Sequence, residues 1–179
     1  MHTATKVILI FLLILTGVTT FAQIADTIQN KPFERYWTKP RIVPKFGVGI
    51  QGSAFAELGF QYHKIYIHPL TLASAGPYLT CDVVILNNEF IVGPKIGYEV
   101  TAGLFGFAAD VGYYSDFDRE SLLITPKAGI SLLGFANLFY GRSFTLSDDS
   151  FHSISVNRFS IVVNFNRDYF DLRDARRKR

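Results

Sequence analysis

From Pro44 onward, the chain alternates between two kinds of residue with a period of two. In residues 89–100, the apolar Val92, Ile96 and Val100 occupy even positions, whereas Lys95 and Glu99 occupy odd ones. Period two places successive side chains on opposite faces of a β-strand, and no segment shows a helical period with caps. We therefore expect an all-β fold. The pattern recurs in eight segments, which we predict to be strands: 45–52, 56–64, 76–86, 89–100, 104–114, 121–132, 135–144 and 155–166.

A short motif, Pro-Lys-x-Gly, recurs in three of these strand regions, at Pro44, Pro94 and Pro126. Each copy is followed by a tight turn and a second strand, so one hairpin unit is used three times. Consecutive hairpins of this kind indicate an up-and-down barrel or a sandwich. The repeat alone does not separate the two. The connection after the second strand, "IYIHPLTLAS", is predicted to be long.

The two faces of the predicted strands differ in a way that favours a membrane barrel. One face carries large apolar side chains, and the other mixes glycine with ionisable residues. A strand face in water has little use for many glycines, because glycine weakens strands. In a closed eight-stranded barrel the interior is just wide enough for side chains, and small residues leave room for long charged ones. We therefore predict an antiparallel up-and-down transmembrane β-barrel, apolar outside and polar inside.

The ionisable residues on the polar face are balanced in sign. A closed interior requires such a balance because a buried charge needs a partner, although a solvated surface could also be balanced by chance. We predict that the charge network of the lumen consists of Lys45, Glu57, Asp82, Lys95, Glu99, Asp110, Lys127 and Arg158. The residues predicted to face lipid are Phe105, Phe107, Val111, Phe159, Ile161, Val163 and Phe165.

The first residues of the chain indicate export. Lys6 precedes an unbroken apolar run, Val7 to Leu15, and small residues follow at Thr20 and Ala22, as in a secretory signal peptide. We expect a signal peptide at 1–22, an N-terminal arm at 23–43, the barrel at 44–166 and a charged tail at 167–179.

The single cysteine, Cys81, excludes an internal disulfide. The formal net charge of +3 is too small to indicate a nucleic-acid partner, so we expect none.

Several stretches together resemble a known class of protein. They are the Phe-Ala-Gln end of the signal, the Pro-Lys-x-Gly strands, "GYYSDF", "YGRSF" and the closing strand "RFSIVVNFN". Over residues 44–166 the chain resembles small eight-stranded outer-membrane β-barrel proteins of Gram-negative bacteria. The resemblance implies an outer-membrane location, with membrane lipid and the outer-membrane assembly machinery as partners. It carries no catalytic residue across.

For function, we expect a structural or surface-interaction role with a filled lumen, and no enzyme activity. The alternatives are a lipid-modifying barrel enzyme, a small diffusion pore, and a soluble exported barrel that binds an apolar ligand. His152 and Ser153, with Asp148 and Asp149, are a weak match to a hydrolase triad, because adjacent loop residues do not define its geometry. His63, His68 and Asp82 match no tight metal-ligand spacing. We predict no catalytic residue, cofactor or metal, and the sequence names no specific ligand.

Overall fold

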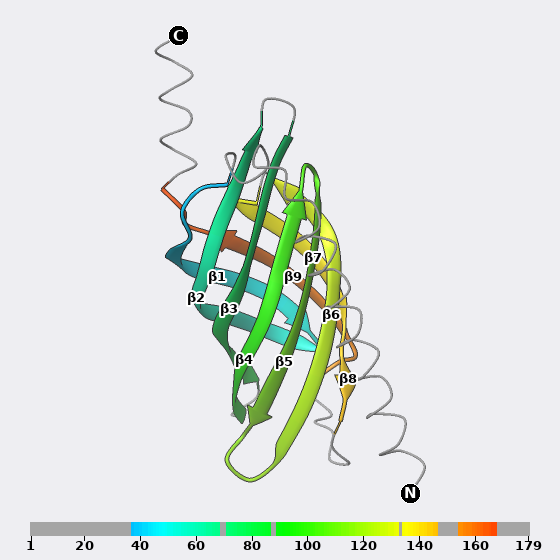
Figure 1. Cartoon of the computed structure of the whole chain (residues 1–179). Coiled ribbons are helices and arrows are strands. Elements are labelled where there is room, and N and C mark those ends of the chain that lie inside the picture. The colour runs from blue at the N-terminus through cyan, green and yellow to red at the C-terminus, as the bar shows by residue number, and fades with distance from the viewer. Residues whose placement is uncertain (1–36, 69–70, 87–88, 133, 147–153, 168–179) are drawn as a thin grey trace, which may run out of the picture. The chain divides into compact units, whose positions relative to one another are not determined.

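The computed structural model describes residues 37–68, 71–86, 89–132, 134–146 and 154–167, which form one closed antiparallel β-barrel (Figure 1). No stretch among these residues is helical, and thus none provides a helix able to cross a membrane. The predicted signal peptide and most of the predicted arm and tail lie outside the described residues. The strands are β1 (Arg41–Gln51), β2 (Ser53–His68), β3 (Thr71–Leu86), β4 (Glu89–Ala102), β5 (Phe105–Ser115), β6 (Glu120–Leu132), β7 (Ala136–Arg142), β8 (Phe144–Thr145) and β9 (Asn157–Asn164).

The barrel closes because the last strand pairs with the first. β9 runs antiparallel to β1, with Val163 opposite Phe46, and it also pairs with β7. β7 and β8 both pair with β6 and are two parts of one wall position, interrupted at Ser143. Every other strand pairs with its neighbours in the chain. The predicted eight-stranded up-and-down barrel is therefore confirmed as a fold.

The largest differences from the predicted strand boundaries lie at one end of the barrel. β1 begins at Arg41 rather than at residue 45, and β2 continues to His68. The long connection predicted after the second strand is wrong, because β3 already begins at Thr71. The prediction failed here because Ile65 and Tyr66 are both apolar and both buried, so the compositional alternation disappears although the strand continues. The last strand is shorter than predicted, 157–164 instead of 155–166.

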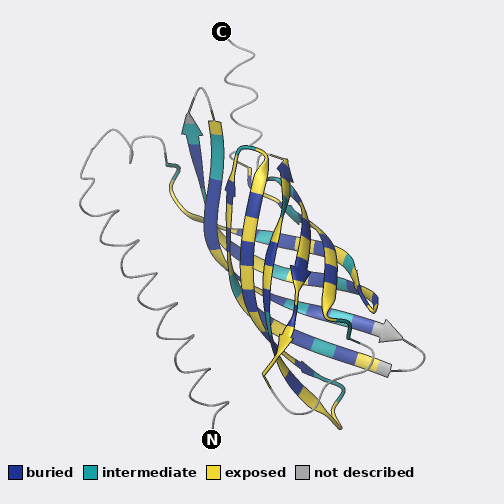
Figure 2. Cartoon of the chain, turned by 90° about the vertical axis from the view of Figure 1, so that its right-hand side faces the viewer, coloured by how far each residue is buried: buried dark blue, intermediate teal, exposed yellow. Residues whose placement is uncertain are grey.

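Burial alternates along the strands as the sequence predicts (Figure 2). In β5, Phe105, Phe107 and Val111 point outward, whereas Asp110 points inward. All seven residues predicted on the apolar side lie on the outer surface, where Val163 is half-buried and the other six are exposed. The outer surface is thus the apolar one.

Glycines on the inner face make room for large side chains. A methyl group on Gly97 would meet the ring of Tyr78 at 2.5 Å, and one on Gly93 would overlap the ring of Tyr114. Both are closer than real carbon contacts allow. The glycines that flank Lys95 in the sequence therefore make space for tyrosine rings rather than for the lysine.

Candidate functional site

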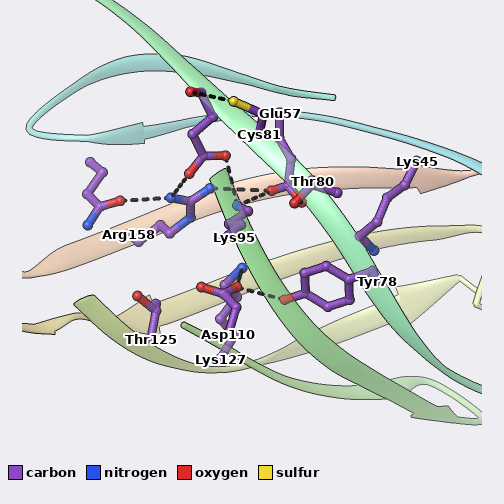
Figure 3. A network of polar contacts seen from close by, with 12 residues as sticks. Lys45, Glu57, Tyr78, Thr80, Cys81, Lys95, Asp110, Thr125, Lys127 and Arg158 are labelled. Carbon is purple, nitrogen blue, oxygen red and sulfur yellow. Dashed lines mark hydrogen bonds and ion pairs between the residues drawn. The ribbon is translucent and has the colours of Figure 1, made fainter. Parts of the chain in front are cut away.

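The candidate site is the charged interior of the barrel. The structure places all eight residues of the predicted charge network inside, with Lys127 the most exposed at 6%. They come from seven strands and converge in the lumen, as the close view in Figure 3 shows for six of them and Tyr78. Their ion pairs are described next, because the pairing pattern determines what this interior can do.

Two carboxylates on neighbouring strands form the centre of the network. Glu57 of β2 lies directly opposite Asp82 of β3. Two like charges opposite one another on adjacent strands repel each other and require cations. Lys95 of β4 supplies one, with Nζ 2.7 Å from Glu57 Oε2 and 2.8 Å from Asp82 Oδ1. Arg158 of β9 supplies the other, 2.6 Å from Asp82 Oδ2 and 3.3 Å from Glu57 Oε2. Each cation thus bridges both acids.

Neutral groups hold the Arg158 guanidinium in position. It donates to Gln51 Oε1 at 2.8 Å and to the Tyr114 hydroxyl at 3.1 Å. It also lies 3.8 Å from the centre of the Phe55 ring, in a cation–π contact. The Tyr114 hydroxyl in turn donates to Asp82 at 2.6 Å. The planar, multivalent donor set of arginine suits such a site, where lysine would satisfy fewer groups.

A second group of contacts surrounds Glu99 of β4. Lys45 of β1 pairs with it across the lumen at 2.6 Å. Asn137 of β7 and Asn164 of β9 donate to its other oxygen at 2.9 and 2.7 Å. Asn164 also accepts from Lys45 at 3.1 Å. Four strands that are distant in sequence are therefore joined at one carboxylate.

The third group joins neighbouring strands. Lys127 of β6 forms a short ion pair with Asp110 of β5, and the Tyr78 hydroxyl donates to the same carboxylate at 2.6 Å. The Tyr78 ring also lies 4.7 Å from Lys45 Nζ. Tyr78 thus links the Lys127–Asp110 pair to the Lys45–Glu99 pair.

The predicted charge network contains only ionisable residues and leaves out the neutral members found here. Tyr78 and Tyr114 were not assigned to the lumen because they are aromatic and the inner face was recognised by its charges. The available signal was parity: Tyr78 shares its phase with Asp82, and Tyr114 shares its phase with Asp110. Gln51, Asn137 and Asn164 also have inward parity in their strands.

The inner face is apolar at one end. Phe55, Val84, Ile91, Tyr114 and Leu123 form a buried cluster there, with Ile154 packed against it. The prediction of a polar inner face does not account for these apolar residues inside the barrel. Beside the cluster lies a small pocket, lined by Ser121, Leu123, Ser143, Thr145, Ile154, Ser155 and Val156. The apolar cluster therefore lies between the charged residues of the lumen and this end of the barrel.

The other candidate residues of the sequence lie apart from the charge network or outside the described residues. His63 is buried and its Nδ1 lies 3.1 Å from the Asn166 amide. In the described part of the chain, no three His, Cys, Asp or Glu residues lie close enough to hold a metal ion. His152, Ser153, Asp148 and Asp149 lie outside the described residues. Cys81 is half-buried on the outward parity of β3.

Comparison with known proteins does not add a functional assignment. No known protein family, curated protein or solved structure matches the chain.

Proposed function

We propose that this protein is an outer-membrane β-barrel with a structural or surface-interaction role and a filled, ion-paired interior. The observation that carries the proposal is the inverted distribution of side chains. Eight ionisable residues are buried inside, while large apolar side chains such as Phe107 and Ile161, 60% and 52% exposed, cover the outside. Exposed apolar surface on this scale marks contact with a partner or a membrane. A barrel with apolar-out and polar-in alternation fits lipid as that partner.

The filled interior favours this role over two alternatives. A diffusion pore needs an open channel, whereas an eight-stranded barrel is filled by its side chains. Here Lys95 and Arg158, paired with Glu57 and Asp82, occupy the lumen. A soluble barrel that binds an apolar ligand would need an apolar interior, and most of the buried side chains described here are polar or charged. The expected signal peptide and the resemblance to outer-membrane barrels add support.

One loop supports the interaction part of the proposal. Phe117 is 80% exposed at the tip of the turn between β5 and β6, and its backbone has a φ of 75°. Asp116 accepts the backbone amides of Asp118 and Arg119 and a forked pair from the Arg119 guanidinium. A bulky residue at positive φ is uncommon and persists where the surroundings impose it. The turn thus presents an aromatic side chain on a rigid base.

Site-directed spin labelling tests the proposal. In a Cys81→Ser background, labels are attached at Phe107→Cys and Ile161→Cys in the full chain refolded into phospholipid vesicles. We expect both labels to be relaxed by oxygen more strongly than by a water-soluble nickel complex. Stronger relaxation by nickel at both positions would refute the membrane barrel. A steady current across a planar bilayer would instead support a pore and contradict the filled lumen.

A further inference from the structure

Both ends of the barrel chain meet at one rim, where the start of β1 and the end of β9 lie side by side (Figure 1). The amide of Phe165 donates to the carbonyl of Pro44 and continues this pairing beyond β9. On the other side, β2 projects beyond the start of β1, and Trp37 pairs with Tyr66 on this projection. Thr38 donates to the Ile65 carbonyl at 2.7 Å and accepts from its amide at 3.0 Å. The segment before β1 is thus fixed to the rim.

The described residues of this rim carry charge of one sign. Lys39, Arg41 and Arg167 are exposed and Lys64 is half-buried. The described residues at this end, 37–44, 62–67, 71–75, 101–106, 130–132, 134–138 and 163–167, contain no aspartate or glutamate. The opposite rim differs, since its β5–β6 turn carries Asp116, Asp118 and Glu120 against Arg119. The four cations, with Trp37 and Tyr66, are called the basic corner below.

Aromatic side chains lie between the cations of the basic corner and the exposed apolar surface. The Trp37 and Tyr66 rings lie 5.3 Å apart, and Lys64 Nζ lies 4.8 Å from the centre of the Trp37 ring. Tryptophan and tyrosine prefer the boundary between acyl chains and head groups. The exposed apolar surface begins immediately below, at Ile42 and Phe165. A ligand there would touch apolar side chains with one part and cations with another.

We propose that the basic corner binds the phosphate head groups of anionic phospholipids in the leaflet that borders this rim. The inference rests on the proposed membrane location. Charge complementarity selects an anion, and the adjoining apolar surface selects one that carries acyl chains. Basic residues next to a membrane attract anionic lipid over about one Debye length, ~8–10 Å at physiological salt. The barrel would then collect anionic lipid on one side rather than evenly around its circumference.

Trp37 is the only tryptophan in the chain, so its fluorescence reports on this corner directly. The full chain is placed in phosphatidylcholine–phosphatidylglycerol vesicles in which either lipid carries brominated acyl chains at the same mole fraction. We expect brominated phosphatidylglycerol to quench Trp37 roughly twofold more than brominated phosphatidylcholine at low salt, with the difference lost near ~1 M salt. Lys39→Gln/Arg41→Gln/Arg167→Gln should abolish the difference. Arg119→Gln/Arg142→Gln, which neutralises two exposed cations elsewhere, should preserve it.

A second protein, Trp37→Phe/Ile161→Trp, separates the two ways to fail. Quenching of Trp at 161 by both lipids, together with equal quenching of Trp37 by both, overturns the basic corner and leaves the membrane barrel intact. Retained preference in the triple variant also overturns the corner. If neither lipid quenches the tryptophan at 161, the membrane location and the inference that rests on it both fail.

Discussion

At the scale of single residues, the interior shows how a barrel tolerates buried charge. An ion removed from water is costly unless its partners are close and its remaining hydrogen-bonding capacity is used. Asp82 meets this condition, because it accepts from Lys95, Arg158 and the Tyr114 hydroxyl. Glu57 accepts from Lys95, Arg158 and the Thr80 hydroxyl. The two acids share both of their cations, so the removal of either cation affects two carboxylates.

Substitution of Lys95 tests this dependence. Lys95→Met should lower the free energy of unfolding by ~3–5 kcal/mol, because it leaves buried carboxylate charge uncompensated. Lys39→Met, at an exposed position, should change it by less than ~0.5 kcal/mol. Urea unfolding of the protein in lipid vesicles, followed by tryptophan fluorescence, measures both. Equal midpoints for the two variants would contradict the role of Lys95 in the lumen.

At the scale of elements, several hydrogen bonds to one carboxylate hold the β5–β6 turn. The Asp116 carboxylate accepts hydrogen bonds from the amides of Asp118 and Arg119. The hydrogen bond from the Arg119 amide lowers the pKa of Asp116. A carboxyl group whose pKa is lower in the folded state stabilises that state at pH values above its pKa in the unfolded chain, ~3.9. The stabilisation is lost as the pH falls through the folded value. The turn should therefore loosen in acid and stay ordered at neutral pH.

A nitroxide at Phe117→Cys, in the Cys81→Ser background, measures this loosening. Asp116→Ala should raise the mobility of the label at neutral pH, because two amides and the Arg119 guanidinium lose their acceptor. The protein with intact Asp116 should show the same rise only below about pH 4. Asp118→Ala is the control and should have little effect. A spectrum unchanged by Asp116→Ala would show that other contacts order the turn.

The elements also show what the sequence could predict. Parity placed Lys95 and Asp110 inside and Phe107 outside, since alternation is a local property of a strand. The pairing of Lys45 with Glu99 was not predictable, because it joins β1 to β4 across the lumen and depends on the stagger of the closed barrel. The sequence did not predict the end of β2 and the start of β3, because both faces of the strands become apolar there, as at Ile65 and Tyr66.

At the scale of the whole molecule, the proposed membrane location requires apolar cover over the middle of the outer surface. Ile161 lies in the middle of β9, opposite Leu138 of β7 and Val48 of β1. All three are exposed. Leu104 is as exposed as these residues, but it lies in the turn between β4 and β5, at the rim. The two kinds of position should respond differently to a charge.

Arginine at these positions tests the depth dependence. Ile161→Arg should destabilise the barrel in lipid by ~2–4 kcal/mol, whereas Leu104→Arg should cost only ~0–1 kcal/mol near the interface. Folding in vesicles, followed by the heat-dependent shift of the folded band on a gel, gives both values from urea titrations. If the two variants lose the same stability, a membrane boundary between the two positions is excluded.

Arg158 is the last of the eight interior charges along the chain, and this order has a consequence for assembly. Its partners, Glu57 and Asp82, belong to β2 and β3. Before β9 docks, the enclosed groups are four carboxylates and three lysines, so the unfinished lumen carries an excess negative charge. If the strands assemble in chain order, the step that closes the wall also neutralises the interior. An intermediate that lacks its final strand keeps an electrostatic penalty against leaving water, so under the proposed membrane location its entry into lipid would depend on the completion of the ring.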